Sequence, residues 1–221
     1  MTALQSVLFD LDGTLHSDRV AVPILVDAAA RAGYVLDPAA VQQGERFVDR
    51  LQAEFGIDAA EADAIYAGYV ELYAERAAGV VQVLDHAPEL LAALSRKGVR
   101  LALVTQKSES LACIILDALG LREWFEVVIG GDSLPHRKPH PAVAQGALAR
   151  LAGEPAAAAS VGDTAYDMAC GQGAGLAFRV GLQGVASAKA LRDAGATHVT
   201  SNLYEAGVIL LGEGQLSAVR Q

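Results

Sequence analysis

Short apolar runs alternate along most of the chain with longer segments of helical periodicity. Most of these runs are continuously apolar, without interleaved polar positions, which is typical of strands buried on both faces of a parallel sheet. The predicted strands are Ser6 to Leu11, Val99 to Thr105, Phe125 to Gly130, Ala158 to Gly162, Ala177 to Val180 and Thr197 to Val199.

The segments between these strands read as helices, with proline near the start and glycine after the end. They include Pro88 to Lys97, Glu109 to Leu119 and Pro141 to Leu151. Strands and helices that alternate in this way predict an α/β fold, a three-layer Rossmann-like core with a mostly parallel sheet.

One long segment lacks a convincing strand. Between His16 and Leu84 the pattern predicts helices, such as Pro38 to Phe55 and Ala59 to Ala78. We therefore expect a small all-helical cap at residues 16–84, inserted into a catalytic core made of residues 1–15 and 85–221.

Composition and charge exclude several classes of protein. Hydrophobic residues make up 52% of the 221 positions, which is enough for a real core. The chain has 17 basic and 26 acidic residues, a net charge of −9, which argues against a nucleic-acid partner and against anionic lipid. A small anionic substrate stays possible, because a metal ion and a few local cations can override the overall sign.

Neither a membrane anchor nor a disulfide framework is expected. No apolar stretch approaches the roughly 18 residues that span a bilayer, and the first apolar run stops at Asp10, unlike a signal peptide. Cys113 and Cys170 form no CxxC pair. We expect a cytoplasmic protein, either a monomer or a homodimer.

Two aspartates directly follow the first apolar run. Asp10 and Asp12 are two positions apart, so on a strand they point to the same side, and Gly13 lets the chain turn sharply. Such a pair suits a divalent metal such as Mg2+, or a nucleophile beside an acid/base group. An ordinary turn explains these residues equally well.

Later strands also end in polar side chains. Thr105 ends the second strand, Lys138 follows the third between two prolines, and Asp163 and Asp167 follow the fourth. Parallel α/β sheets bind ligands at the carboxyl ends of their strands. Four strands that each end in polar side chains at one edge of the sheet favour a functional site over four ordinary turns.

These residues carry a family resemblance. Asp10-Leu11-Asp12-Gly13-Thr14, Thr105, Lys138 and Gly162-Asp163-Thr164-Ala165-Tyr166-Asp167 are similar, in order, to the four motifs of the haloacid dehalogenase (HAD) superfamily. The stretch from Gly130 to Pro141 resembles the phosphoglycolate phosphatase branch, which has a helical cap after its first motif.

The resemblance implies a Mg2+-dependent phosphatase. Asp10 would attack phosphorus and form an aspartyl-phosphate, while Asp12 would act as acid and then as base. Asp10, Asp163 and the backbone carbonyl of Asp12 would hold Mg2+. The substrate would be a small phosphorylated metabolite such as 2-phosphoglycolate.

The resemblance also implies supporting roles. Thr105 and Lys138 would bind the phosphoryl oxygens, and Asp167 would orient ligands or pair with Lys138. Gln106 stands where relatives often have Asn, and we expect it near the phosphate or Asp12. Arg46 and Arg50, four apart on a predicted helix, would contact substrate from the cap, although a solvated helix face also explains them.

Alternatives to this interpretation differ in strength. A β-phosphoglucomutase-like phosphotransferase would use the same core residues, and a sugar phosphate, a nucleotide or pyrophosphate would be another possible substrate. Relatives commonly have valine-aspartate-serine where this chain has His16-Ser17-Asp18, so substrate identity is open.

A zinc site at His136 and His140 is not expected, because the neighbouring prolines disfavour a helix and no other His or Cys completes the set.

Overall fold

The computed structural model describes residues 3–17, 19–40 and 47–212. The chain divides into two compact units, unit 1 with Met1–Ser17 and Gln82–Gln221, and unit 2 with Asp18–Val81. Cys113 and Cys170 are both free thiols. None of the helices in the described ranges combines the length and the apolar character that a bilayer crossing requires. The expected cytoplasmic location and oligomeric state stay predictions.

Unit 1 is built on a six-stranded sheet in the order β5-β4-β1-β6-β7-β8, in which every neighbouring pair is parallel. This confirms the predicted α/β class with a mostly parallel sheet. The strands are β1 (Ser6–Phe9), β4 (Arg100–Val104), β5 (Val127–Ile129), β6 (Ala158–Gly162), β7 (Phe178–Leu182) and β8 (His198–Thr200).

The first strand lies inside the sheet, between β4 and β6. Phe9 is paired in register with Leu103 on one side and with Val161 on the other. All four residues of β1 are buried, as its continuous apolar pattern predicts. Because the registers match, the residues that follow β1, β4 and β6 leave the sheet at nearly the same level.

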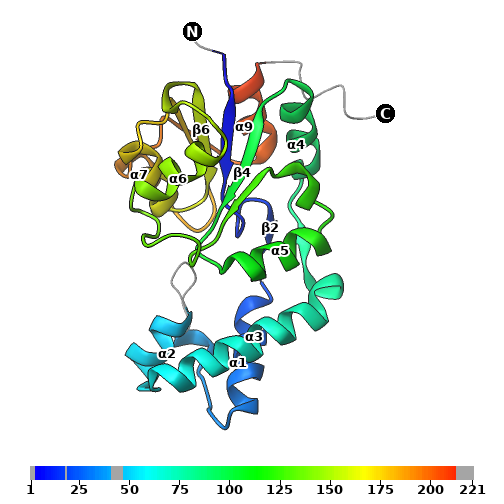
Figure 1. Ribbon diagram of the computed structural model, residues 1–221, viewed down its shortest axis with the longest axis vertical. Helices are drawn as coiled ribbons and strands as arrows, with labels where there is room; N and C mark the ends of the chain where they lie inside the picture. The colour runs from blue at the N-terminus through cyan, green and yellow to red at the C-terminus, as the bar shows by residue number, and fades with distance from the viewer. Residues whose placement is uncertain (1–2, 18, 41–46, 213–221) are drawn as a thin grey trace. The chain divides into compact units, whose positions relative to one another are not determined.

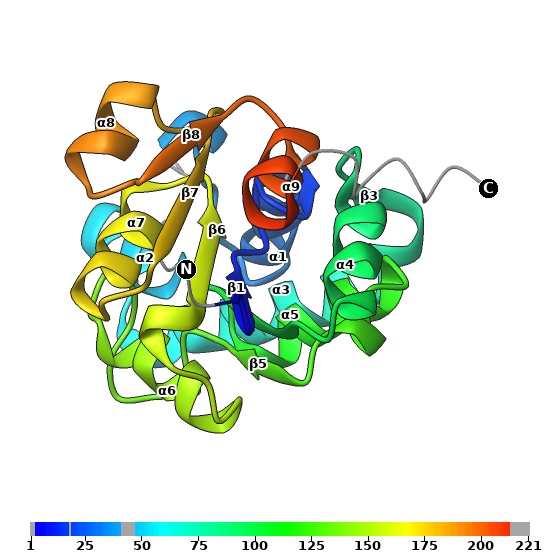
Figure 2. The same cartoon turned by 90° about the horizontal axis from the view of Figure 1, so that it is seen from above.

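Helices cover both faces of this sheet. Helices α6 and α7 lie on one face and α4 and α9 on the other (Figure 2). Leu8, Ala102 and Ile129 pack with residues of α6 and α7 in one buried cluster. The helices of unit 1 are α4 (Ala87–Arg96), α5 (Glu109–Ala118), α6 (Ala142–Arg150), α7 (Ala165–Gly173), α8 (Ala188–Asp193) and α9 (Leu203–Leu211), with 3-10 turns η2 (Arg122–Trp124) and η3 (Pro155–Ala157).

Unit 2 is helical (Figure 1). Helices α1 and α2 both pack against α3, where Tyr69 and Tyr73 are fully buried and stack edge to face. The side chain of Asp58 caps the start of α3 by accepting from the backbone N–H of Glu61. The elements are α1 (Ala21–Arg31), η1 (Pro38–Ala40), α2 (Phe47–Phe55) and α3 (Ala59–Val80).

The expectation that residues 16–84 contain no strand is wrong. A two-stranded antiparallel sheet joins β2 (His16–Ser17) to β3 (Gln82–Val83), where the chain leaves unit 1 and returns to it. Two residues are too few to show a hydrophobic period, so no sequence pattern marks them. The helix predicted over 38–55 contains η1 and α2, and residues 41–46 between them lie outside the described ranges.

Candidate active site

Polar side chains gather at the carboxyl edge of four adjacent strands of the sheet. Asp10 follows β1, Thr105 follows β4, and Asp163 follows β6, and all three are buried. Lys138, also buried, comes from the loop after β5. The sheet order therefore brings together the residues that the sequence placed at separate strand ends.

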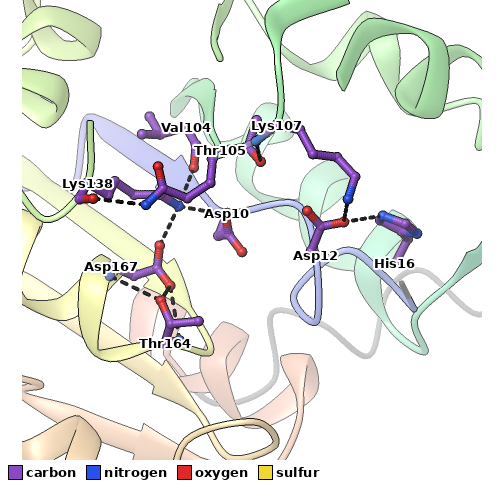
Figure 3. A network of polar contacts seen from close by, with 10 residues as sticks. Asp10, Asp12, His16, Val104, Thr105, Lys107, Lys138, Thr164 and Asp167 are labelled. Carbon is purple, nitrogen blue, oxygen red and sulfur yellow. Dashed lines mark hydrogen bonds and ion pairs between the residues drawn. The ribbon is translucent and has the colours of Figure 1, made fainter. Parts of the chain in front are cut away.

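The ammonium group of Lys138 occupies the middle of this cluster (Figure 3). Its Nζ donates to Oδ1 of Asp10 and to Oδ1 of Asp167, both at 2.6 Å, and to the backbone carbonyl of Val104 at 2.8 Å. A lysine has three N–H donors, so all of them are used. Burial alone would lower the pKa of Lys138, but the two carboxylates outweigh it and raise that pKa.

Asp167 holds this ammonium group while it caps a helix. Its Oδ2 accepts from the backbone N–H of Thr164 at 3.0 Å and from the Thr164 hydroxyl at 2.5 Å. Together with the bond from the Asp167 N–H to Thr164 Oγ1, these contacts form a capping box at the start of α7. The helix cap thus fixes the carboxylate that faces Lys138 (Figure 3).

Three buried carboxylates could hold a metal ion. Oxygen atoms of Asp10, Asp163 and Asp167 lie within 4.8 Å of one another. Oδ1 of Asp163 is buried and has no hydrogen-bond partner among the described residues.

Burial, followed by the charge of Asp167, raises the pKa of Asp163 to about 7. Burial also raises the pKa of Asp10 well above its usual range, although Lys138 opposes this. One ammonium group does not balance three carboxylates, so the donor set fits a divalent cation.

Gly13 makes room for this cluster. Its φ of +70° lies in the left-handed region that favours glycine, and a Cβ built on it would lie 2.1 Å from Oδ2 of Asp163. Both facts require glycine here. The turn after β1 therefore packs its bare backbone against a carboxylate of the candidate metal site.

Asp12 belongs to a different network from Asp10 (Figure 3). Its Oδ1 lies 2.8 Å from Nε2 of His16 and 3.0 Å from Nζ of Lys107. Burial alone would raise the pKa of Asp12, but the charge of Lys107 and the hydrogen bond from His16 outweigh it and lower that pKa. The Asp12 side chain keeps 27% of its surface exposed, against 9% for Asp10, so it is the more accessible of the two carboxylates.

The residues after β4 position Lys138 and Lys107. The amide nitrogen of Gln106 donates to the backbone carbonyl of Lys138 at 2.9 Å, so this side chain supports the Lys138 loop. The hydroxyl of Thr105 accepts from the backbone N–H of Lys107 at 3.2 Å. A three-residue segment therefore helps to place both cations of the site.

Of the two cap arginines, the structure describes Arg50 alone. Arg50 is a buried residue of α2 whose Nη2 lies 2.6 Å from Oε1 of Glu54. Arg46 lies outside the described ranges. Substrate contact by either arginine stays a prediction.

Sequence reasoning missed three residues of the two networks. Lys107 follows Thr105 at the same two-residue spacing that links Asp12 to Asp10, so the strand-end rule could have found it. His16 is four positions after Asp12, within reach of a tight turn. Thr164 has the spacing of a capping box to Asp167, which is a recognisable signal.

The rings of His136 and His140 stack at 3.8 Å, although prolines flank the second histidine. Among the described residues, no third metal ligand joins these two histidines. Across the part of the chain that the structure describes, the carboxylates of Asp10, Asp163 and Asp167 form the one group of three or more side chains suited to a metal.

Comparison with known proteins identifies relatives of this chain. The sequence profile described as "Haloacid dehalogenase-like hydrolase" matches residues 7–180. Phosphoglycolate phosphatase 1 of Pseudomonas aeruginosa is 31% identical over 211 residues, which cover 90% of this chain and 77% of that protein. Phosphoglycolate phosphatase of Rhodospirillum rubrum is 36% identical over 189 residues, covering 78% and 77%.

Solved structures share the fold. The crystal structure of CbbY from Rhodobacter sphaeroides in complex with phosphate superposes with a TM-score of 0.81 at 23% identity, covering 94% of this chain and 100% of that one. At this identity the likeness is evidence for the fold alone.

Proposed function

The chain belongs to the haloacid dehalogenase-like hydrolase family, and from that premise we propose that it hydrolyses a small phosphomonoester through an aspartyl-phosphate on Asp10. It is an enzyme of the phosphomonoester hydrolase class. The observation that carries the mechanism is a buried carboxylate, Asp10, with one oxygen 2.6 Å from the ammonium group of Lys138. Such a carboxylate is a nucleophile beside a cation that stabilises an incoming phosphoryl group.

Mg2+ is the cofactor of this proposal. Asp10, Asp163 and the backbone carbonyl of Asp12 would hold it, and the unpartnered Oδ1 of Asp163 supports a cation there. When bound, Mg2+ supplies positive charge that the phosphoryl oxygens need. Asp167 stays with Lys138, since both of its oxygens already accept hydrogen bonds.

In the first step a carboxylate oxygen of Asp10 forms a bond to phosphorus while the ester P–O bond breaks. Lys138 and Thr105 stabilise the equatorial oxygens. Asp12 gives its proton to the departing alkoxide. Lys107 keeps Asp12 ionised in the free protein, and the negative charge of the arriving phosphate favours uptake of the proton that the acid role requires.

In the second step Asp12 accepts a proton from water as the water oxygen attacks phosphorus. The bond between phosphorus and Asp10 breaks, and inorganic phosphate and the free Asp10 carboxylate result. One group acts first as acid and then as base because the second step reverses the proton demand of the first.

We favour 2-phosphoglycolate as the substrate class, because relatives named phosphoglycolate phosphatase cover most of this chain. The test is phosphate release from 2-phosphoglycolate, β-glucose 1-phosphate, a nucleoside monophosphate and pyrophosphate, in Mg2+ and in EDTA. We expect Mg2+-dependent release that is fastest, by kcat/KM, with 2-phosphoglycolate. A higher value for another ester would overturn the substrate assignment, and a sugar bisphosphate formed without phosphate release would favour the phosphotransferase alternative.

Asp10→Asn tests the nucleophile, with Asp193→Asn as a control because Asp193 is an exposed carboxylate of α8 that pairs with Lys189. We expect Asp10→Asn to lower kcat by about 10³-fold or more, and the control to match the wild type. Turnover by Asp10→Asn at the wild-type rate would refute the mechanism.

We also propose that unit 2 is the cap that selects the leaving group. If Arg50 contributes, Arg50→Gln raises KM for the natural substrate more than for an aryl phosphate. Equal effects on both substrates would remove this role from Arg50.

A further inference from the structure

His16 is an unusual residue for its surroundings. Its side chain is completely buried, and Nε2 lies 2.8 Å from Oδ1 of Asp12. Nδ1 is buried and has no partner among the described residues. If Nε2 carries the proton, Nδ1 is an unpaired acceptor, whereas the other tautomer would bury an unpaired N–H and lose the bond to Asp12. The geometry therefore favours a histidine that donates to Asp12.

Backbone hydrogen bonds hold His16 beside Asp12. The N–H of Gly13 donates to the carbonyl of His16 at 2.9 Å, and the N–H of His16 donates to the carbonyl of Leu11 at 3.2 Å. His16 also begins β2, which pairs with β3 through Val83. The turn closes on itself around Asp12, so the backbone of His16 is held beside that residue, and the complete burial of the side chain restricts rotation of the ring.

Lys107 reaches the same oxygen from another element. Its Nζ lies 3.0 Å from Oδ1 of Asp12, and its backbone N–H is held by Thr105. Figure 3 shows the two donors meeting at one carboxylate oxygen, His16 from the turn after β1 and Lys107 from the loop after β4. Both contacts fall on Oδ1 of the carboxylate.

We propose that His16 is a positioning residue that, with Lys107, anchors Oδ1 of Asp12 and leaves Oδ2 as the atom that carries the proton. The inference rests on the proposed phosphatase function. In the first step the proton moves from Oδ2 to the leaving alkoxide as the ester P–O bond breaks, and in the second step Oδ2 takes a proton from water. His16 and Lys107 keep their protons throughout and hold the carboxylate in place.

The test compares two leaving groups. A departing alkoxide needs a proton, whereas p-nitrophenolate is stable as an anion, so poor positioning of Asp12 harms only the alkyl ester strongly. We would measure kcat/KM for 2-phosphoglycolate and for p-nitrophenyl phosphate with wild-type protein, His16→Leu, His16→Gln and Lys107→Met. His198→Gln is the matched control, since His198 is an exposed histidine of β8.

For His16→Leu we expect kcat/KM with the alkyl ester to fall about tenfold or more beyond its fall with the aryl ester. Lys107→Met changes the ratio in the same direction. His16→Gln keeps an N–H donor and restores the ratio to within about threefold of the wild type. His198→Gln leaves both substrates unaffected.

Equal losses on both esters in a folded His16→Leu protein, or no loss, would overturn the inference while the phosphatase proposal stands. If His16→Leu does not fold, a His16→Gln ratio shifted as far as that of Lys107→Met would overturn it instead. A wild-type protein that hydrolyses neither ester in Mg2+ would overturn the proposed function and this inference with it.

Discussion

Lys138 and Asp10 form a buried ion pair, with Nζ 2.6 Å from Oδ1 and less than a tenth of either side chain exposed. Removing one partner of such a pair leaves an uncompensated charge. We therefore predict that Lys138→Met lowers the free energy of unfolding by about 3–5 kcal/mol, measured by urea denaturation without metal. Lys189→Met removes the lysine of an exposed pair and should leave the urea midpoint unchanged.

A double variant separates stability from chemistry at this position. Lys138→Met with Asp167→Asn removes one of the carboxylates that Lys138 neutralises, so it should recover part of the lost stability. It should recover no activity, because the phosphoryl oxygens still lack their cation. An unaltered urea midpoint in Lys138→Met would contradict the buried pair.

The raised pKa of Asp163 predicts that the stability of the fold depends on pH, which can be measured without an activity assay. Its pKa in the folded protein is raised from 3.8 to about 7, so folding without metal favours its protonated form. That contribution is complete below about pH 4 and is lost as the pH rises through 7. Mg2+ neutralises the ionised carboxylate, so we expect Mg2+ to raise Tm more at pH 8 than at pH 6, by differential scanning fluorimetry.

Asp163→Asn is the control for that experiment. It removes the buried charge, so its Tm in EDTA at pH 8 should exceed the wild-type value by about 2–4 °C. Mg2+ should no longer shift it. A wild-type shift of the same size at both pH values would argue against Asp163 as a metal ligand.

Gly13→Ala tests the close approach of the first turn to Asp163. We expect Gly13→Ala to weaken Mg2+ binding, measured by calorimetry, and to lower activity sharply, because its Cβ would overlap Oδ2 of Asp163. Gly98→Ala is the matched control, since Gly98 has φ +73° but no atom within 4 Å of its Cβ position. Both variants carry the left-handed backbone cost of about 1–2 kcal/mol. Equal Mg2+ affinity in the two variants would show that the overlap is harmless.

The capping box of α7 gives a second matched pair of variants. Thr164→Ala and Asn202→Ala each remove a side-chain cap, at α7 and at α9, and should each cost about 1 kcal/mol of stability. Thr164→Ala also removes the hydroxyl that donates to Oδ2 of Asp167 and leaves only the backbone N–H on that oxygen, so we expect it alone to reduce kcat. A comparable kcat for the two variants would mean that the cap does not position Asp167.

The strands were predictable because burial on both faces leaves a continuous apolar run. The observed β6, Ala158–Gly162, has the predicted bounds, while the predicted Ser6 to Leu11 runs two residues beyond the observed β1. Of those extra residues, Asp10 still donates its backbone N–H to the carbonyl of Val161 in β6, and Leu11 belongs to the turn. The pair β2 and β3 was invisible, since a two-residue strand has no period.

The gathering of Asp10, Thr105, Lys138 and Asp163 followed from one rule about parallel strand ends. The partners of Asp12 were missed. Lys107 follows β4, so the same rule places it at this edge, but its contact with Asp12 is known only from the order of strands in the sheet. His16 was noticed as a departure from relatives, but its burial against Asp12 requires the closed turn.

The central position of β1 has a consequence for how the protein is made. Its neighbours β4 and β6 come from residues 100–104 and 158–162. During synthesis the first strand therefore cannot pair on both edges until residue 162 has been made. Asp10 can meet Lys138 only after residue 138 has left the ribosome, and it can meet Asp163 only after residue 163 has done so. A nascent chain that ends before β6 therefore lacks the complete candidate site, and one edge of its apolar first strand has no neighbouring strand.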